Sequence, residues 1–576
     1  MKNFFTYFFL ASIFCCIACS RLRSAKGDVV YGGTLKISET DRYTTLYPPA
    51  ISEDIGGHIA NQIYEGLVRF SMKDLSIQPA IAEKWEIDPN GTIYTFTLRK
   101  GIRFHDDPCF PDGKGRELTA ADVKYSFELL CTNIKENSNF SAILKDKVVG
   151  ANEFYAASNG TPNGSLKGVE IIDDYTIRIT LLHPNISFLS TLAMVGASII
   201  PKEAVDKYGM NTKVGTGAFI FSETENGTII LTRNPDYYGT DELGNQLPFL
   251  DSVVVKMLSK ADELAEFQKH ELSLVNGLPS ESVTEIVTKQ ITDFKNKPPK
   301  YILERLPEMA NQYYEFNLIK EPFKDIRTRK AFSYAIDRNR IVDEVLNGEA
   351  YGPAIYGFCP PSIQGYDITK IKGYDYDPVK AKQFLAEAGY PDGKGFPKIK
   401  IELNSGGSKH TRVVADIQKQ LKTVLNIDVD FEVVTQKQKL EDAKFARSEI
   451  VRSSWVADFP SPESFLFVLY GGTLPADLTA ETFPNTQRYK NPVFDSLYEA
   501  GKAAKTQEEA YRNYMNAEQL MMNDAPVMML WYSENYRLIN SNVHNLFPNP
   551  IRYRNYATVY LKELELLPKE GEVENY

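Results

Sequence analysis

The chain has few of the residues that build metal centres. Its 576 residues include six histidines, six cysteines and three tryptophans. The histidines lie far apart, with no pair at i, i+4, so metal ligation has no local support. His105, in a Phe-His-Asp stretch, is expected to be a hydrogen-bonded structural residue. We therefore expect no metal site and no cofactor.

Motifs of common enzymes are also missing. The sequence contains no Gly-x-Ser-x-Gly nucleophile turn, no His-Glu-x-x-His zinc motif and no phosphate-binding glycine loop. The formal net charge is −10, with no basic cluster to offset it, which argues against nucleic acid as a partner. The 33 tyrosines and 32 phenylalanines suit a protein that binds through polar-tipped aromatic walls. These features favour a binding role over an enzyme.

Long apolar runs are absent except at the start of the chain. After Met-Lys-Asn, residues 4–19 are almost wholly apolar and end in small residues, a pattern typical of an export signal. Ala18 directly before Cys19 favours a lipoprotein signal, although Cys16 stands where such signals usually have leucine. We predict a signal peptide over 1–18, lipidation at Cys19 and a polar tether over 19–30. A plain secretion signal is the alternative.

Besides the lipidated Cys19, three cysteines remain after the predicted cleavage, at positions 109, 131 and 359. Outside the cytoplasm Cys109 and Cys131 could form a disulfide, but three cysteines cannot all pair. The sequence leaves this pairing open.

The body of the chain alternates helical and strand patterns. This alternation predicts α/β layers with partly parallel sheets. Helices are expected at 54–69, from 119 onward, and at 325–346, 378–389, 411–425 and 506–523; strands are expected at 398–403, 428–434 and 526–531, with a hairpin over 85–99.

The stretch from Arg452 to Phe465 contains the most informative charges. Its β-forming residues predict a short strand, which Pro460 and Pro462 end. Alternation puts Arg452 and Asp458 on one face, with Ser454 and Val456, and puts Trp455 on the other. The two Cα atoms would lie about 20 Å apart, and the charged heads about 10 to 13 Å apart, near the length of an extended tripeptide. The alternative is two ordinary surface charges with Trp455 in the core.

Several segments, in order and spacing, resemble one known family. They include Ile63-Tyr-Glu-Gly-Leu-Val, the Asp88-Pro-Asn-Gly hairpin, Val214-Gly-Thr-Gly-Ala-Phe and the long run from Phe316 to Arg338. Together they resemble the peptide-binding branch of the periplasmic solute-binding proteins of ABC importers. The similarity extends from about Gly32 to Tyr560.

This resemblance implies a two-lobed α/β fold of the periplasmic-binding-protein type, with an extra subdomain inserted in the first lobe and a hinge of two crossing strands near Lys300 and Pro526. The expected limits are 31–65, 200–300 and 527–576 for lobe I, 66–199 for the inserted subdomain and 301–526 for lobe II. The expected function is a monomeric receptor that closes over short peptides and delivers them to ABC permease subunits.

The resemblance also assigns ligand-binding residues. Asp458 is expected to pair with the α-ammonium of a peptide, since an ammonium offers donors only. Arg452 is expected to take the carboxylate of a short peptide, and the backbones of Ser454 and Val456 to pair with its main chain. Trp455 is either a wall of the site or core. The opposite wall is expected around 53–57 in lobe I.

Other functions stay open at this point. Members of this fold family also carry nickel complexes, haem, glutathione or sugars. A surface lipoprotein that binds host molecules or signals peptide levels, and an envelope peptidase, are the remaining alternatives.

Overall fold

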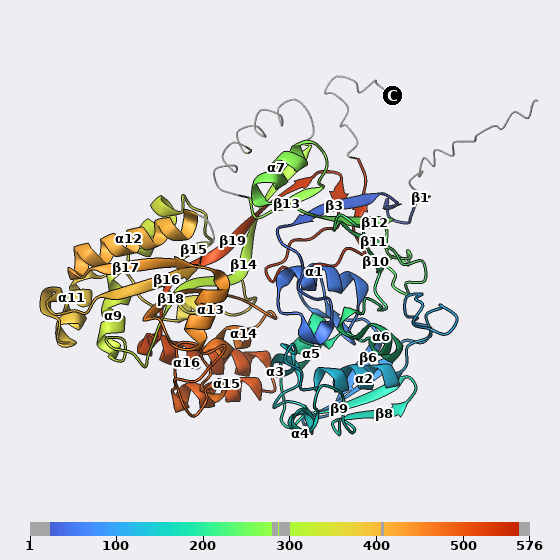
Figure 1. The fold of residues 1–576 in the computed structure, drawn as a ribbon, viewed down its shortest axis with the longest axis horizontal. Coiled ribbons are helices and arrows are strands. Elements are labelled where there is room, and N and C mark those ends of the chain that lie inside the picture. Colours follow the sequence, from blue (N-terminus) through green and yellow to red (C-terminus); the bar gives the residue numbers. More distant parts are fainter. Residues whose placement is uncertain (1–22, 279–285, 287–299, 405–407, 564–576) are drawn as a thin grey trace, which may run out of the picture.

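The computed structural model describes residues 23–278, 286, 300–404 and 408–563. It has two lobes joined by two long antiparallel strands, β14 (Tyr301–Phe316) and β19 (Val527–Asn540) (Figure 1). The predicted two-lobed α/β class is confirmed. The domain limits stay a prediction, and the predicted signal peptide and Cys19 lie outside the described residues.

Lobe I is built around a four-stranded sheet with the order β10-β11-β12-β3. The pair β12–β3 is parallel and the other pairs are antiparallel. Leu35 and Ile37 alternate along β3 and point into a core shared with helix α1. The elements are β3 (Thr34–Glu39), α1 (Asp54–Ile63), β10 (Phe219–Glu223), β11 (Ile229–Arg233), β12 (Ser252–Met257) and α7 (Lys260–Gln268).

A subdomain is inserted in sequence between β3 and β10. Its antiparallel sheet has the order β6-β7-β9-β8. The predicted hairpin is confirmed: Asp88 closes its turn by accepting hydrogen bonds from the N–H groups of Thr92 (2.7 Å) and Ile93 (2.8 Å). The elements are β4 (Val68–Phe70), β5 (Ile77–Pro79), β6 (Ala82–Ile87), β7 (Ile93–Leu98), α2 (Ala120–Leu130), α3 (Phe140–Ile143), α4 (Ala151–Ala157), β8 (Val169–Asp173), β9 (Thr176–Thr180), α5 (Phe188–Leu192) and α6 (Lys202–Tyr208).

Lobe II shares a seven-stranded sheet with the crossing strands, in the order β13-β19-β14-β18-β16-β17, with β15 beside β19. The pairs of β16 with β17 and with β18 are parallel. The strands are β13 (Leu274–Asn276), β15 (Gly352–Pro353), β16 (Ile399–Asn404), β17 (Val429–Val434) and β18 (Ile450–Val456). The helices are α9 (Ile326–Ala335), α11 (Pro378–Glu387), α12 (Ser408–Leu425), α13 (Gln436–Lys444), α14 (Pro462–Leu466), α15 (Pro492–Lys502) and α16 (Gln507–Asp524).

The crossing strands change register where they pass between the lobes. Pro307 pairs with Glu534, and the next paired residue of β14 is Asn311, opposite Tyr532. Extra residues on one strand bend and twist a ladder locally. The bulge therefore lies where the crossing strands pass from one lobe to the other.

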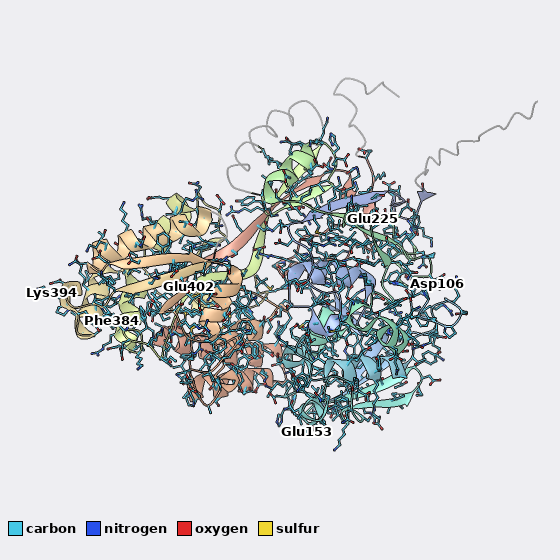
Figure 2. The ribbon with its side chains drawn as sticks, in the orientation of Figure 1. Asp106, Glu153, Glu225, Phe384, Lys394 and Glu402 are labelled. Carbon is cyan, nitrogen blue, oxygen red and sulfur yellow. The ribbon has the colours of Figure 1, made fainter. Side chains whose placement is uncertain are left out.

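The inserted subdomain touches lobe II, so the structure is in a closed arrangement. The N–H of Ile186 donates to the carbonyl of Lys502, at the end of α15, over 3.1 Å. One buried apolar cluster contains residues of both parts, including Phe188 and Phe465. Figure 2 labels Glu153 in the subdomain and Glu402 in lobe II, on the two sides of this contact.

Two expected helices are shorter than the sequence pattern suggests. The helix expected at 54–69 ends at Ile63, because Tyr64 is extended and the chain then enters β4. The helix expected at 325–346 breaks after Ala335, and Asp337 caps a new short turn by accepting from the N–H of Arg340. In both cases apolar periodicity continues across a backbone break.

Candidate functional site

Strand β18 offers one free edge to the space between the lobes. It pairs with β14 along its length, from Ile450 to Val456, but with β16 only at Ile450 and Val451. The Ala457 N–H donates to Met309 O on the β14 side over 2.9 Å. Along an antiparallel strand, the backbone N–H and C=O groups of successive residues point alternately toward and away from the partner strand. Since Ala457 bonds to β14, the backbone groups of Val456 and Ser454 point to the opposite edge.

Asp458 follows this strand and interacts electrostatically with Asp54 of lobe I and Lys147 of the inserted subdomain. The Asp458 side chain is exposed to solvent, but many protein atoms surround it and reduce its hydration. Desolvation therefore raises the pKa of Asp458 to about 6; Ser464 and Lys147 oppose the rise and Asp54 adds to it. The Asp458 N–H donates to Ser464 Oγ (2.9 Å), which orients the turn after β18. Among the described residues Asp458 has no ion-pair partner.

Lys147 reaches the same region from the inserted subdomain. Its ammonium donates to the carbonyl of Ala142, on helix α3. Burial lowers the pKa of Lys147 to about 8, while the carboxylates of Glu463 and Asp458 raise it. Glu463 is itself buried and accepts a hydrogen bond from Tyr514 (3.1 Å). Lys147 is thus a cation of the subdomain placed against acidic groups of lobe II.

Lobe I contributes a second acidic group through Asp54, the first residue of α1. Asp54 accepts a hydrogen bond from Arg552 Nη1 over 3.0 Å. The same guanidinium donates to both carboxylate oxygens of Glu308, over 2.7 and 2.9 Å. Glu308 is 6% exposed and lies in the bulge of β14. This three-residue bridge connects α1 with the crossing strand.

The other end of the free edge is basic. The Arg452 guanidinium donates to the neutral side chains of Gln312 and Asn404 (3.3 Å). Burial lowers the pKa of Arg452 to about 10, so the group stays charged at neutral pH. Its buried Nε has no hydrogen-bond partner, and no carboxylate in the described part of the chain pairs with it. An uncompensated buried cation of this kind suits an anionic ligand group.

Two further basic residues, at the start of α12, surround this arginine. Burial, followed by the charges of Arg452 and Lys409, lowers the pKa of His410 to about 3, so the imidazole is neutral at physiological pH. Burial lowers the pKa of Lys409, whose ammonium lies 5.7 Å from the ring centre of Trp531. Neither residue could be predicted as part of the site, because the pair lies far from Arg452 in sequence and only the fold brings the three residues together.

Trp455 packs at the side of β18 opposite to Arg452. Its ring lies 6.2 Å from that of Phe483, which is 51% exposed. The backbone N–H of Trp455 donates a hydrogen bond to Asn311 Oδ1 over 3.1 Å. The indole Nε1 of Trp455 is buried and has no hydrogen-bond partner. The expected alternation of faces is consistent with this packing, and the role of Trp455 in binding stays a prediction.

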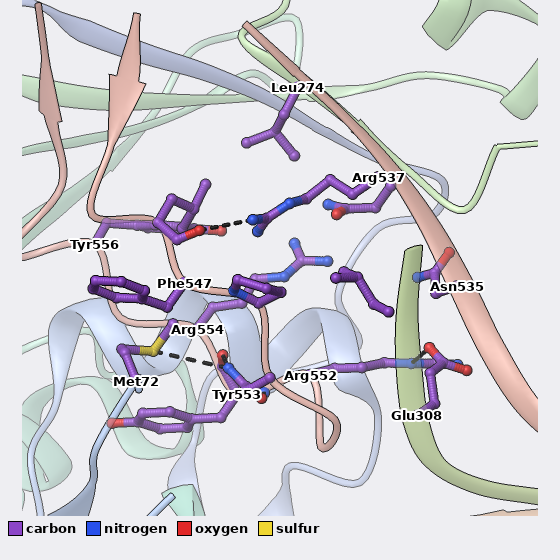
Figure 3. A pocket seen from close by; sticks show the side chains of 15 residues that line it. Met72, Leu274, Glu308, Asn535, Arg537, Phe547, Arg552, Tyr553, Arg554 and Tyr556 are labelled. Atoms are coloured by element: carbon purple, nitrogen blue, oxygen red, sulfur yellow. Dashed lines mark hydrogen bonds and ion pairs between the residues drawn. The ribbon is translucent and has the colours of Figure 1, made fainter. Parts of the chain in front are cut away.

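A separate pocket lies beside the hinge in lobe I (Figure 3). Its arginines already have acidic partners: Arg537 pairs with Glu304 (2.5 Å) and Arg552 with Glu308. Phe547, Tyr553 and Met72 form its apolar side. The pocket contains none of the residues that the sequence predicted for the site.

Four other findings concern the histidines, the cysteines, metal binding and membrane spans. His105 is buried and its Nε2 lies 2.9 Å from Gly217 O, as expected of a structural histidine. Cys109, Cys131 and Cys359 are free thiols. Within the described ranges, no group of three or more His, Cys, Asp or Glu side chains could hold a metal ion. In the same ranges, no helix has the length and apolar character needed to cross a bilayer.

Comparison with known proteins decides the family. A model described as bacterial extracellular solute-binding proteins, family 5 middle, matches residues 76–475. The chain belongs to this family. Its members are solute-binding receptors, so the protein is a binding protein and not an enzyme, as the missing motifs suggested.

Individual family members have similar length and fold. The chain is 27% identical to a dipeptide-binding protein of Escherichia coli, over 87% of this chain and 89% of that one. It is 29% identical to heme-binding protein A of Haemophilus influenzae, over 86% of each chain. Among solved structures, the ABC transporter-associated periplasmic binding protein DppA of Helicobacter pylori, in complex with the peptide STSA, has 26% identity and a TM-score of 0.75, covering 92% of this chain and 99% of that one.

Proposed function

We propose that this family 5 protein is a receptor for short peptides that closes over its ligand and delivers it to the permease subunits of an ABC importer. The free edge of β18 between an acidic end and a basic end supports this most strongly. An extended peptide has the same three features: an ammonium, a hydrogen-bonding main chain and a carboxylate. The peptide-bound Helicobacter pylori relative is consistent with this cargo.

In this proposal the ligand runs antiparallel to β18. Its ammonium lies at Asp458, its main chain pairs with the backbones of Ser454 and Val456, and its carboxylate lies toward Arg452. Main-chain pairing ignores side-chain identity, so a range of sequences can bind. Lys409 extends the basic end and, with the neutral imidazole of His410 beside it, would receive the carboxylate of a longer peptide.

Closure of the lobes would trap the ligand. The bulge of β14 at Glu308 provides the bend, and the contact between Ile186 and Lys502 exists only when the subdomain lies against lobe II. A ligand that touches both lobes stabilises the closed state over the open one and shifts the population toward it. The closed form is then the form that a transporter recognises.

We also propose that a lipid on Cys19 anchors the receptor outside the cytoplasmic membrane, as a monomer. The signal pattern over 1–18 supports the anchor. Metabolic labelling with a radioactive fatty acid tests it: the wild-type chain should take up label, and Cys19→Ser should not.

The cargo itself can be measured directly. The protein is purified without denaturation from its native host, and the bound solute is released and analysed by mass spectrometry. A set of short peptides with free ends is expected. Haem, a metal complex, a sugar or glutathione as the main solute would contradict the proposed cargo while leaving the family intact.

A further inference from the structure

Asp54 has an exposed carboxylate at the start of α1, whereas the carboxylate of the residue before it is held by backbone N–H groups. The carboxylate of Glu53 turns back and accepts hydrogen bonds from the N–H groups of Thr44 (2.8 Å) and Ser52 (3.4 Å). Asp54 makes a single contact with Arg552, and its side chain is 54% exposed. Its carboxylate therefore keeps accepting capacity on the solvent side.

The strand register brings Asp54 near the acidic end of the predicted ligand edge. Ala310 pairs with Val456, and the Ala457 N–H donates to Met309 O, so Glu308 and Asp458 are each the next residue beyond this last backbone contact. Arg552 binds Glu308 with two hydrogen bonds and Asp54 with a third. One guanidinium thus connects Asp54 with Glu308, the residue next to Met309 at the end of the contact between β14 and β18.

The charges in this region do not balance. Arg552 and Lys147 bring two positive charges to four carboxylates, those of Asp54, Glu308, Asp458 and Glu463. Asp54 and Asp458 repel each other across the cleft. The closed lobes therefore hold an excess of negative charge where the two sides meet, and this excess favours a cation between them.

We propose that Asp54 is a second specificity-determining residue, which faces Asp458 from the opposite lobe so that closure is favourable only with a cationic ligand end between the two carboxylates. The proposal rests on the assignment of the ligand ammonium to Asp458. It adds that lobe I, through Asp54, discriminates against ligands with a neutral end. An N-acetylated peptide has no charged amino group, so it would lose the ion pair with Asp458. It would also leave the repulsion between Asp54 and Asp458 uncompensated.

The proposal is tested by calorimetry with a tripeptide that has a free amino group and with its N-acetylated form. Asp54→Asn should weaken binding of the free peptide about tenfold, a typical size for one partly exposed charge contact. It should leave binding of the acetylated peptide unchanged or stronger. The ratio of the two affinities should therefore fall by about tenfold or more. Thermal melting checks that the variant is folded.

Two variants serve as controls. Asp54→Glu keeps the charge and should retain most of the wild-type ratio. Glu225→Gln removes an exposed carboxylate of lobe I outside the expected wall at 53–57, and it should leave the ratio unchanged (Figure 2). If Asp54→Asn alters both affinities by the same factor, or neither, the proposal for Asp54 is wrong while peptide binding stands. If the wild-type protein binds neither peptide, the proposed function fails as well.

Discussion

The guanidinium of Arg552 donates two hydrogen bonds to the carboxylate of Glu308, over 2.7 and 2.9 Å, and so joins the C-terminal segment of lobe I to the bulge of the crossing strand. Met309 reinforces the same junction, because its N–H donates to Pro550 O over 2.7 Å. The bend between the lobes is thus held from the side of lobe I. The stability of this junction should therefore depend on Arg552.

Arg552→Ala should destabilise the protein. The substitution leaves the nearly buried Glu308 without its partner, which costs about 1 to 3 kcal/mol of the free energy of unfolding. Urea denaturation followed by circular dichroism measures this change. Lys394→Ala, on the exposed surface of lobe II (Figure 2), is the matched control and should be neutral. Equal stability of Arg552→Ala and the wild type would show that the bridge contributes nothing.

Peptide affinity should depend on pH near the pKa of Asp458. The ammonium binds the ionised carboxylate, and desolvation raises the pKa of this group to about 6. Affinity should therefore be constant above about pH 7 and fall as pH drops through 6, by up to about tenfold per unit, because a growing fraction of Asp458 is protonated. Calorimetry between pH 4.5 and 8 gives the profile. An affinity that stays flat down to pH 5 would contradict the role of Asp458.

Removing the charge of Lys147 should move this profile. Lys147 lowers the pKa of Asp458, so Lys147→Met should shift the midpoint of the affinity profile to higher pH. The same calorimetric series measures the shift. Lys145→Met provides a control, since Lys145 is exposed and does not act on Asp458. A midpoint that moves to lower pH, or does not move, would show that the contact of Lys147 with the site is misassigned.

Arg452→Gln should affect peptides of one length more than others. The charged end of Arg452 is fixed by Gln312 and Asn404, so it can reach only one carboxylate position along β18. We expect the affinity of a tripeptide to fall at least tenfold, and that of longer peptides to fall less, because these reach Lys409 and His410. Binding of a series from two to five residues tests this. A uniform loss across the series would assign Arg452 a structural role instead.

Much of the fold could be predicted from local patterns. The hairpin at Asp88, the strand around Trp455 and the alternation of helices and strands follow from periodicity and turn residues, and each is present. The two helices that end early could not be predicted, because apolar spacing continues past the extended Tyr64 and past Ile336. Tertiary packing, which the local sequence does not encode, decides those ends.

The site was only partly predictable. Arg452 and Asp458 belong to one short stretch of sequence, which alternation of faces could relate, although β18 ends at Val456 and Asp458 follows it. Asp54, Lys147 and Glu308 come from three distant segments, and no local pattern connects them to Asp458. The sequence also gave no sign that the edge of β18 is free beyond Val451, since that depends on how far β16 extends alongside it.

The pairing of Asp458 with a ligand ammonium is the central claim, and one comparison of affinities tests it most directly. Calorimetry is done with a free peptide and its N-acetylated form, on the wild type and on Asp458→Ala. The wild type should bind the free peptide far more tightly, and Asp458→Ala should lose about 3 to 5 kcal/mol of that affinity, because it leaves a buried ammonium without a partner. Equal affinity of the wild type for the two peptides would contradict the account.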